Sequence, residues 1–189
     1  MMKSQLRQHY KNLRQAFVKD QGDHDFALDF LTSFQKYVAP LITPGMCVAL
    51  YHALPHEADP RCIAERLFDH GVQVAFPKME GETIDFVHVE ESTAFTTSAY
   101  IFQEPLSHTS MAPDIVLAPL LAFDKEGHRL GYGKGHYDRA ISTLRSQKKV
   151  RVIGLAYPCE QTDTLPHEDH DQKLDAVLLP HAYIEFNTI

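Results

Sequence analysis

A glycine-rich segment from Gly131 to Gly135 carries residue types and a spacing suited to binding a phosphorylated ligand. Its three glycines alternate with Tyr132 and Lys134, and a helix is predicted to begin close to the last of them. Alternating glycines let successive backbone N–H groups approach a ligand closely. The helix start adds free N–H groups and the positive end of its dipole. With the charge of Arg129 nearby, the segment predicts a polyphosphate site.

The segment differs from two common nucleotide-binding motifs. Lys134 is followed by Gly135 instead of Ser or Thr, which excludes a Walker A loop. The third glycine follows one intervening residue instead of two, which excludes the dinucleotide fingerprint. Nucleophile-elbow and protein-kinase signatures do not occur in the sequence. The 12 histidines lack cysteine partners and an HExxH pattern, so a zinc site is not predicted.

Asp138, just inside the predicted helix, is a candidate ligand for Mg²⁺. This cation prefers one or two carboxylates together with water and substrate phosphates. The other interpretation of Asp138 is a favourable charge at the start of a helix. An acidic residue in or just after the polar segment 161–173 could supply a second carboxylate.

Helical and strand patterns alternate along the chain. Helices are predicted over 3–19 and about 25–37, from Asp59 to near Gly71, and from about Gly135. Strands are predicted over 46–51, 72–76, 83–88, 114–118, 150–157 and 174–179, with Pro77 and Gly81 in the turn between the second and third. The alternation predicts an α/β fold with an open, largely parallel sheet and helices on both faces, as a single domain over residues 1–189.

The first predicted helix has an apolar stripe and a basic ridge beside it. The stripe is expected to be buried and consists of Leu6, Tyr10, Leu13 and Phe17. The ridge consists of Lys3, Arg7, Lys11 and Arg14. Two interpretations of the ridge remain open: a solvated helix surface, or a binding surface for an anion.

The composition of the chain limits the kinds of partner and the cellular compartment that we expect. The 18 Lys and Arg against 25 Asp and Glu give a net charge of −7, which argues against nucleic acid as the main partner. The three cysteines are widely spaced and predict no disulfide framework. Residues 1–15 are polar, and no apolar run approaches the ~20 residues that span a bilayer, so a soluble, cytoplasmic protein without membrane partners is expected.

The segment PLLAFDKEGHRLGYGKGHYDR, residues 119–139, resembles the signature of the 5-formyltetrahydrofolate cyclo-ligase family. Shorter similar parts occur in the same order at Lys3 and Arg7, 51–57, 76–78, 103–105 and 171–175. The resemblance implies an open α/β architecture shared with phosphosugar isomerases and CoA transferases. It also implies an activity: ATP and Mg²⁺ convert 5-formyltetrahydrofolate to 5,10-methenyltetrahydrofolate, ADP and phosphate. Phosphorylation of the formyl oxygen precedes attack by N10.

The resemblance also implies roles for individual residues. ATP contacts fall on Lys3, Arg7, Arg129, Gly131, Tyr132, Gly133, Lys134, Gly135, His136 and Tyr137. Metal carboxylates fall on Asp138 and Asp171. Substrate contacts fall on Tyr51, His52, Glu57 and Lys78, and catalytic roles on Tyr137 and Lys134. Phe76, Tyr100 and Phe102 could stack on flat rings or belong to the core. His136 stands where many members have tyrosine, which could alter folate affinity.

Two other functions remain open from the sequence. One is a non-catalytic phosphosugar-sensing module of a regulator, and the other is a different small-molecule kinase or ATP-using enzyme with the same loop. The pair Asp138 and Asp171 and the basic ridge favour an enzyme, because a sensor needs neither. The expected partners are small molecules, and the expected state is a monomer.

Overall fold

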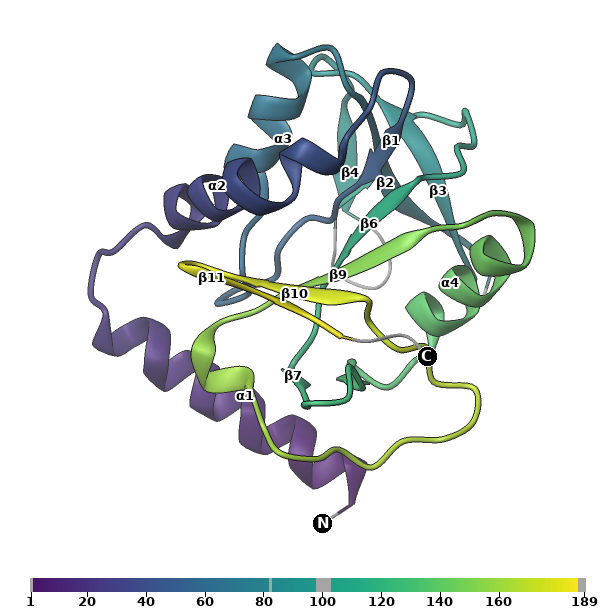
Figure 1. The fold of residues 1–189 in the computed structure, drawn as a ribbon. Helices are drawn as coiled ribbons and strands as arrows, with labels where there is room; N and C mark the ends of the chain where they lie inside the picture. The colour runs from purple at the N-terminus through teal and green to yellow at the C-terminus, as the bar shows by residue number, and fades with distance from the viewer. Residues whose placement is uncertain (1, 82, 98–102, 187–189) are drawn as a thin grey trace.

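Short, wholly apolar strands form the centre of a seven-stranded sheet (Figure 1). Every residue of β1 (Cys47–Ala49), β6 (Ile115–Ala118) and β10 (Ala176–Leu179) is buried, as expected of strands covered on both faces. The other strands are β2 (Gln73–Glu80), β3 (Thr83–Val89), β9 (Arg151–Leu155) and β11 (Ala182–Glu185). This computed structural model describes residues 2–81, 83–97 and 103–186.

The strand order is β11-β10-β9-β6-β1-β2-β3. The five strands from β10 to β2 run parallel, and β11 and β3 pair antiparallel at the two edges. Two small antiparallel pairs lie outside this sheet: β4 (Phe95–Thr97) with β5 (Gln103–Pro105), and β7 (Ala122–Phe123) with β8 (Arg129–Leu130). The largely parallel sheet predicted from the sequence is confirmed.

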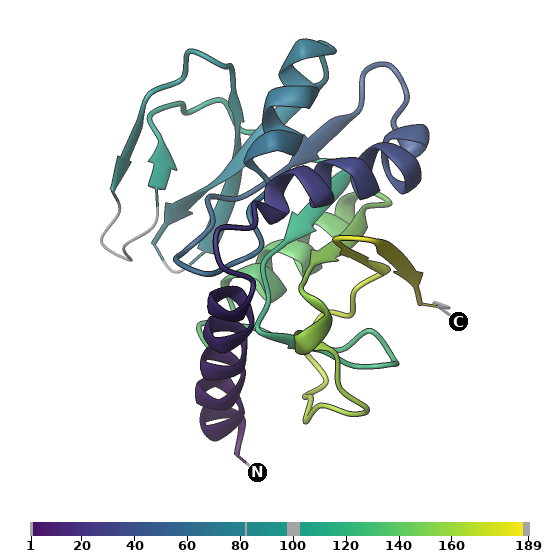
Figure 2. The same cartoon turned by 90° about the vertical axis from the view of Figure 1, so that its left-hand side faces the viewer.

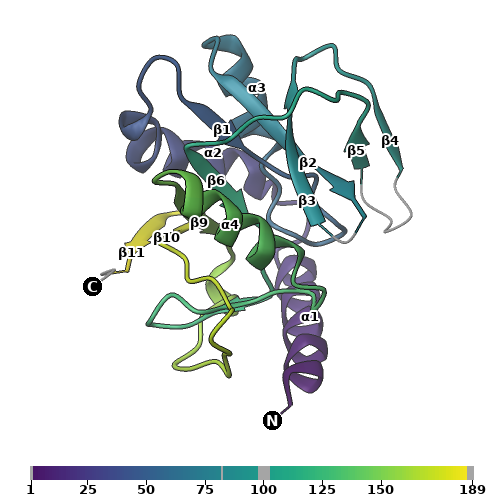
Figure 3. The ribbon, with the colours of Figure 1, turned by 90° about the vertical axis from the view of Figure 1, so that its right-hand side faces the viewer.

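Helices cover both faces of the sheet (Figures 1 and 3). On one face, α2 (Phe26–Tyr37) and α3 (Arg61–Asp69) pack apolar side chains into a core with Val48 and Leu117. On the other face, α4 (His136–Gln147) packs Ala140, Ile141 and Leu144 against the sheet, as predicted. Two short 3₁₀ helices are η1 (Ala39–Leu41) and η2 (Pro158–Glu160).

α1 (Lys3–Asp20) extends below these layers, where it contacts η2 (Figure 2). Its buried face differs from the predicted stripe, because Leu13 is 37% exposed whereas Arg14 is 4% exposed. The residues of α1 that face the rest of the protein include positions 3, 7, 10, 14 and 17. Apolar and basic residues therefore share one face of the helix. The prediction of an apolar stripe with a separate ridge is therefore wrong at Leu13 and Arg14. The anion-binding interpretation of the ridge gains support at Lys3 and Arg7, both of which line the cavity described below.

The turn predicted at Pro77 is also wrong. Pro77 lies within β2 and pairs with Phe86 of β3. The pairing of β1 with β2 ends at Ala75, so the missing N–H of Pro77 interrupts no hydrogen bond to β1. At α3, Asp59 accepts a hydrogen bond from the backbone N–H of Arg61 at 2.9 Å, and the helix begins one residue after Pro60.

None of the helices within the described residues is long and apolar enough to cross a membrane.

Candidate active site

A cavity of about 560 Å³ lies beyond the carboxyl ends of β1 and β6. The chain proceeds from β1 to β2 on one side of the sheet and from β6 to β9 on the other, so the direction of winding reverses between these two strands. Ligands of open α/β sheets bind at such a position. Four segments supply most of the polar lining: the start of α1, residues 51–57 after β1, residues 129–138 before and within α4, and residues 168–171. Pro77 and Met79 of β2, Ile84 of β3 and Pro119 after β6 add an apolar part.

The glycine loop needs glycine at Gly133 for two reasons. Its φ of +98° is a conformation that residues with a side chain rarely adopt. A Cβ atom there would also lie 2.8 Å from the guanidinium carbon of Arg7. Arg7 in turn donates from Nε to the carbonyl oxygen of Gly131 at 2.9 Å. The loop and the basic side chain of α1 are therefore fitted to each other.

Gly135, in the left-handed conformation, is the N-cap of α4 and leaves the first turn without a side-chain cap. The exposed Lys134 lies beside it and also lines the cavity. Backbone N–H groups at a helix start, together with a lysine and Arg7, form a suitable site for a polyphosphate.

Two of the predicted phosphate-binding cations, Lys3 and Arg129, have carboxylate partners. Lys3 Nζ lies 2.8 Å from Asp171 and 2.9 Å from Glu168. Partial burial lowers the pKa of Lys3, but its hydrogen bonds to these carboxylates outweigh that effect and raise the pKa. Arg129, whose side chain is 3% exposed, donates from Nη2 to Asp138 at 2.8 Å.

The two predicted metal carboxylates lie next to each other in space. Asp138 accepts a hydrogen bond from the backbone N–H of Gln172 at 3.2 Å, which brings it beside Asp171. Burial opposes ionisation of Asp171, but Lys3 and the backbone N–H of Glu168 hold its pKa below the usual range. Two carboxylates at one edge of a phosphate site fit Mg²⁺, which takes its remaining oxygens from phosphate and water. Among the described residues, no group of three or more His, Cys, Asp or Glu forms a complete protein cage for a metal.

Glu57 is a buried carboxyl group in the wall of the cavity, next to Tyr132 of the glycine loop. It accepts a hydrogen bond from Tyr132 Oη and a second from the backbone N–H of Leu54 at 2.7 Å. Its burial raises the pKa of the carboxyl group, and these two donors act in the opposite direction. Tyr51 donates to the carbonyl oxygen of Ala58 at 2.5 Å, which closes the segment that carries Glu57.

His52 and Tyr137 also line the cavity. The ring of His52 lies 4.8 Å from that of Phe76 and 4.4 Å from that of Phe95, and burial lowers the pKa of His52. Burial raises the pKa of Tyr137, so its hydroxyl stays protonated. Within the described residues, Tyr137 Oη and His52 Nε2 are buried without a hydrogen-bond partner.

The structure gathers the predicted site residues with one exception. All the residues that the sequence assigned to ATP, folate or metal, except Lys78, line the same cavity. Lys78 does not, because neighbouring strand residues point to opposite sides of the sheet and Pro77 and Met79 are the ones that face the cavity. Lys78 Nζ instead donates to the carbonyl oxygen of Ser107 at 2.8 Å.

Of the predicted stacking residues, Phe76 is buried and packs against His52. Tyr100 and Phe102 lie outside the described residues. The sequence reasoning missed the apolar wall formed by Leu54, Met79 and Ile84.

It also missed the roles of Arg14 and Glu160 behind Glu57. Arg14 belongs to the predicted basic ridge, but the spacing of the ridge does not show that Arg14 is buried. No sequence pattern marks Glu160.

A sequence profile of the 5-formyltetrahydrofolate cyclo-ligase family matches residues 1–180. The chain belongs to this family. It is 31% identical over 140 residues to a 5-formyltetrahydrofolate cyclo-ligase of Haemophilus influenzae, covering 70% of this chain and 74% of the relative. It is 28% identical over 155 residues to the Escherichia coli K12 cyclo-ligase, covering 78% and 85%.

Solved structures agree with the cyclo-ligase fold. The 5,10-methenyltetrahydrofolate synthetase of Aquifex aeolicus superposes with a TM-score of 0.80 at 24% identity, covering 100% of this chain and 95% of the other. The synthetase of Mycoplasma pneumoniae gives a TM-score of 0.72 at 25% identity, covering 94% and 98%. The resemblance and the α/β fold predicted from the sequence are confirmed, and these relatives give no support to a phosphosugar-sensing module.

Proposed function

We propose that this protein converts 5-formyltetrahydrofolate to 5,10-methenyltetrahydrofolate with consumption of ATP and release of ADP and phosphate. The observation that supports this most directly is the composition of one cavity. A glycine loop with basic side chains, a pair of carboxylates and a buried glutamate with an aromatic and apolar wall all line it. Nucleotide and folate therefore have complementary places within reach of each other.

The triphosphate of ATP binds along residues 131–135, with Lys3, Arg7 and Arg129 as counter-charges. In support, Arg7 already contacts the loop and the other two cations line the same cavity. Asp138 and Asp171 hold Mg²⁺, which supplies charge neutralisation at the phosphates when bound. With a metal on these carboxylates, Lys3 and Arg129, which are paired with them, would be available to phosphate oxygens.

The folate binds with its pterin toward Glu57. A carboxylate accepts two parallel hydrogen bonds from the N–H groups of an amino-pyrimidine edge, and Glu57 is the buried carboxylate in this wall. Tyr51, His52 and Met79 border the flat ring system. Lys78 lies outside the lining of the cavity, so it would contact only a part of the folate that extends beyond the cavity, such as the glutamate tail.

The chemistry requires positioning more than acid–base catalysis. A formamide oxygen leaves poorly until it carries a phosphoryl group, and transfer of that group depends mainly on alignment and charge neutralisation. Lys134 neutralises charge on the transferring phosphoryl group. Tyr137 donates a hydrogen bond near the formyl group, in keeping with its buried, unpartnered hydroxyl. N10 then attacks the activated carbon, and phosphate leaves.

The protein acts as a single domain over residues 1–189, as a cytoplasmic monomer whose partners are small molecules, without nucleic acid or membrane. One continuous sheet that includes strands from residue 47 to residue 185 supports the single domain. Three free cysteines and a net charge of −7 support a reducing compartment and a non-nucleic-acid partner.

The direct test mixes pure protein with MgATP and 5-formyltetrahydrofolate and follows the absorption band of the methenyl product together with ADP. We expect one ADP per methenyl product and no product without ATP. Asp138→Asn should lower kcat/KM by about 10- to 100-fold, because a metal carboxylate is lost. Asp169→Asn, an exposed acid of the neighbouring loop, is the matched control and should retain the wild-type rate. Folded wild-type protein without product would refute the proposed reaction.

A further inference from the structure

A buried charged cluster lies directly behind Glu57, and the proposed reaction does not use it. Arg14 of α1 is 4% exposed and donates from Nη2 to Tyr132 Oη at 2.8 Å. Its Nη1 lies 3.4 Å from Glu160 Oε1 and 3.9 Å from Glu57 Oε1. The same Nη1 donates to the carbonyl oxygen of Leu120 at 3.2 Å. One guanidinium thus faces two buried carboxyl groups.

Each carboxyl group accepts two hydrogen bonds, but both are short only at Glu57. Glu57 accepts from Tyr132 Oη and from the backbone N–H of Leu54. Glu160 accepts from the backbone N–H of Tyr157 at 2.8 Å and, at a longer distance, from Arg14. Donors close to a carboxylate stabilise its ionised form. The geometry therefore favours ionisation of Glu57 over that of Glu160.

Among the residues that the structure describes, Arg14 is the cation that contacts Glu160. Lys11, whose ammonium group lies 5.3 Å from the ring centroid of Tyr132, faces the Glu57 side of the cluster. The other titratable neighbours within the described residues are neutral acids that burial keeps protonated: Tyr51, Tyr132, Tyr137, Tyr157 and Cys159. Lys11 is exposed, so Arg14 is the buried cation of the cluster. Two ionised carboxylates against this one buried guanidinium would leave a poorly compensated buried charge, which is costly.

We propose that this cluster retains one proton on Glu160 and that Arg14 thereby holds Glu57 ionised at the cavity wall. Arg14 and Glu160 are then positioning residues that act on the substrate through Glu57. The location of the proton does not depend on the proposed function, whereas the effect on folate binding rests on it. Burial raises the pKa of Glu160 to about 8, in agreement with a protonated group at neutral pH.

Carbon-13 NMR of glutamate side-chain carboxyl carbons tests the location of the proton directly. The resonance that disappears in Glu160→Gln belongs to Glu160, and the one that disappears in Glu57→Gln belongs to Glu57. At pH 7 in the wild-type protein we expect the Glu160 resonance at its protonated position and the Glu57 resonance at its ionised position. Glu160 should titrate with a midpoint near 8. An ionised Glu160 or a protonated Glu57 at pH 7 would overturn the proposal.

Kinetics test whether Arg14 acts through Glu57. The positive charge of Arg14 lowers the pKa of Glu57, so its removal raises that pKa and reduces the ionised fraction on the acid side. In Arg14→Met, the acid limb of the pH profile of kcat/KM for the folate should shift upward by about one pH unit. The acid limb of the corresponding profile for ATP should not shift. Arg14→Lys keeps a charge and should shift the limb less. Glu65→Gln, an exposed glutamate of α3, is the matched control.

Two outcomes would contradict this role for Arg14. One is a folate limb in Arg14→Met that coincides with the wild-type limb. The other is an equal shift in the limbs for ATP and folate, which indicates a general structural effect. If Arg14→Met does not fold, Arg14→Lys with the NMR titration of Glu57 decides the question. If the wild-type enzyme lacks cyclo-ligase activity, the NMR result still stands or falls by itself.

Discussion

Gly133 and Arg7 show how closely the phosphate loop is fitted to α1. The guanidinium group occupies the space that a side chain at residue 133 would need, and its Nε bonds the backbone of Gly131. The cation is therefore positioned before a ligand arrives. Ligand binding then costs less side-chain entropy than it would if Arg7 were free to move. A small change at Gly133 should disturb the nucleotide more than the folate.

Gly133→Ala should raise the KM for ATP by about tenfold or more, since the new Cβ, 2.8 Å from the guanidinium carbon, displaces Arg7 from its hydrogen bond to Gly131. Positive φ adds about 1–2 kcal/mol of strain, which lowers the free energy of unfolding. Gly45→Ala is the matched control, because its φ of +89° gives similar strain while nothing lies within 4 Å. Steady-state kinetics and urea unfolding separate the two effects. Equal KM values for ATP in both variants would contradict the fit between Gly133 and Arg7.

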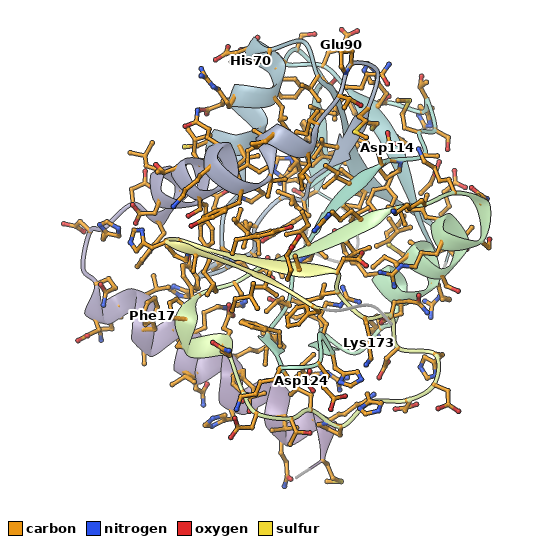
Figure 4. The ribbon with its side chains drawn as sticks, in the orientation of Figure 1. Phe17, His70, Glu90, Asp114, Asp124 and Lys173 are labelled. Atoms are coloured by element: carbon orange, nitrogen blue, oxygen red, sulfur yellow. The ribbon has the colours of Figure 1, made fainter. Side chains whose placement is uncertain are left out.

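The segment 161–173 supplies Asp171, although it contains no helix or strand of its own. Asp124, labelled in the lower part of Figure 4, ties this segment to the turn between β7 and β8. Its carboxylate accepts from the backbone N–H groups of Glu126, His128 and Leu165 and from the ring of His128. The ring of His128 stacks on that of His167 at 3.8 Å. One buried carboxylate thus fixes the path of the segment that leads to Asp171.

Asp124→Asn should lower the free energy of unfolding by about 2 kcal/mol, because an amide N–H₂ group replaces one acceptor and faces other donors. The donors around Asp124 lower its pKa despite the opposing effect of burial. Its stabilisation is therefore complete above the unfolded pKa of about 3.9 and is lost as pH falls through the lower folded value.

Urea unfolding at several pH values measures this contribution. The difference between wild type and Asp124→Asn should be constant from pH 7 to about 5 and shrink below about 4. Asp163→Asn, an exposed acid of the same segment, should change stability by less than about 0.5 kcal/mol. A difference that grows toward acid pH would contradict the assigned role of Asp124.

Over the whole molecule, the features that could be predicted from the sequence are those that a contiguous stretch of residues determines. The loop at 131–135, its helix and the buried strand before it are contiguous, so their combination is visible in the sequence. The folate end was predictable only through family resemblance, because Glu57 gains its environment from Tyr132, 75 residues away. Lys78 shows the limit of this approach, since the register of β2 decides which side chains reach the cavity.

Other features depend on contacts between distant segments. Arg14 and Glu160 are 146 residues apart, and nothing local in the sequence predicts that they meet. The edge strand β11 and the pair β4 and β5 are short, and no strong alternation distinguishes them from loops. The burial of Arg14 likewise follows from the position of α1 on the loops, which helical periodicity alone does not fix.

The position of α1 outside the layers leads to a prediction for the molecule as a whole. A small apolar cluster holds the helix through Tyr10, Leu121 and Leu165, and the cations at its start reach across to the loop and to Asp171. Changing Lys3 and Arg7 together to alanine should therefore leave the sheet folded and remove two counter-charges from the triphosphate. We expect the KM for ATP to rise by about 10- to 100-fold and the KM for the folate by much less.

Two exposed lysines outside the cavity provide the control for charge. Lys19→Ala with Lys149→Ala removes the same net charge, so a general change in the electrostatic field would affect both double variants equally. Thermal unfolding with and without MgATP gives a second readout, because a ligand stabilises the folded state by RT ln(1 + [L]/Kd). The variant at Lys3 and Arg7 should lose most of the nucleotide-induced rise in Tm, and the control should keep it. If the two double variants respond alike, the basic face of α1 is a solvated surface and the nucleotide binds without it.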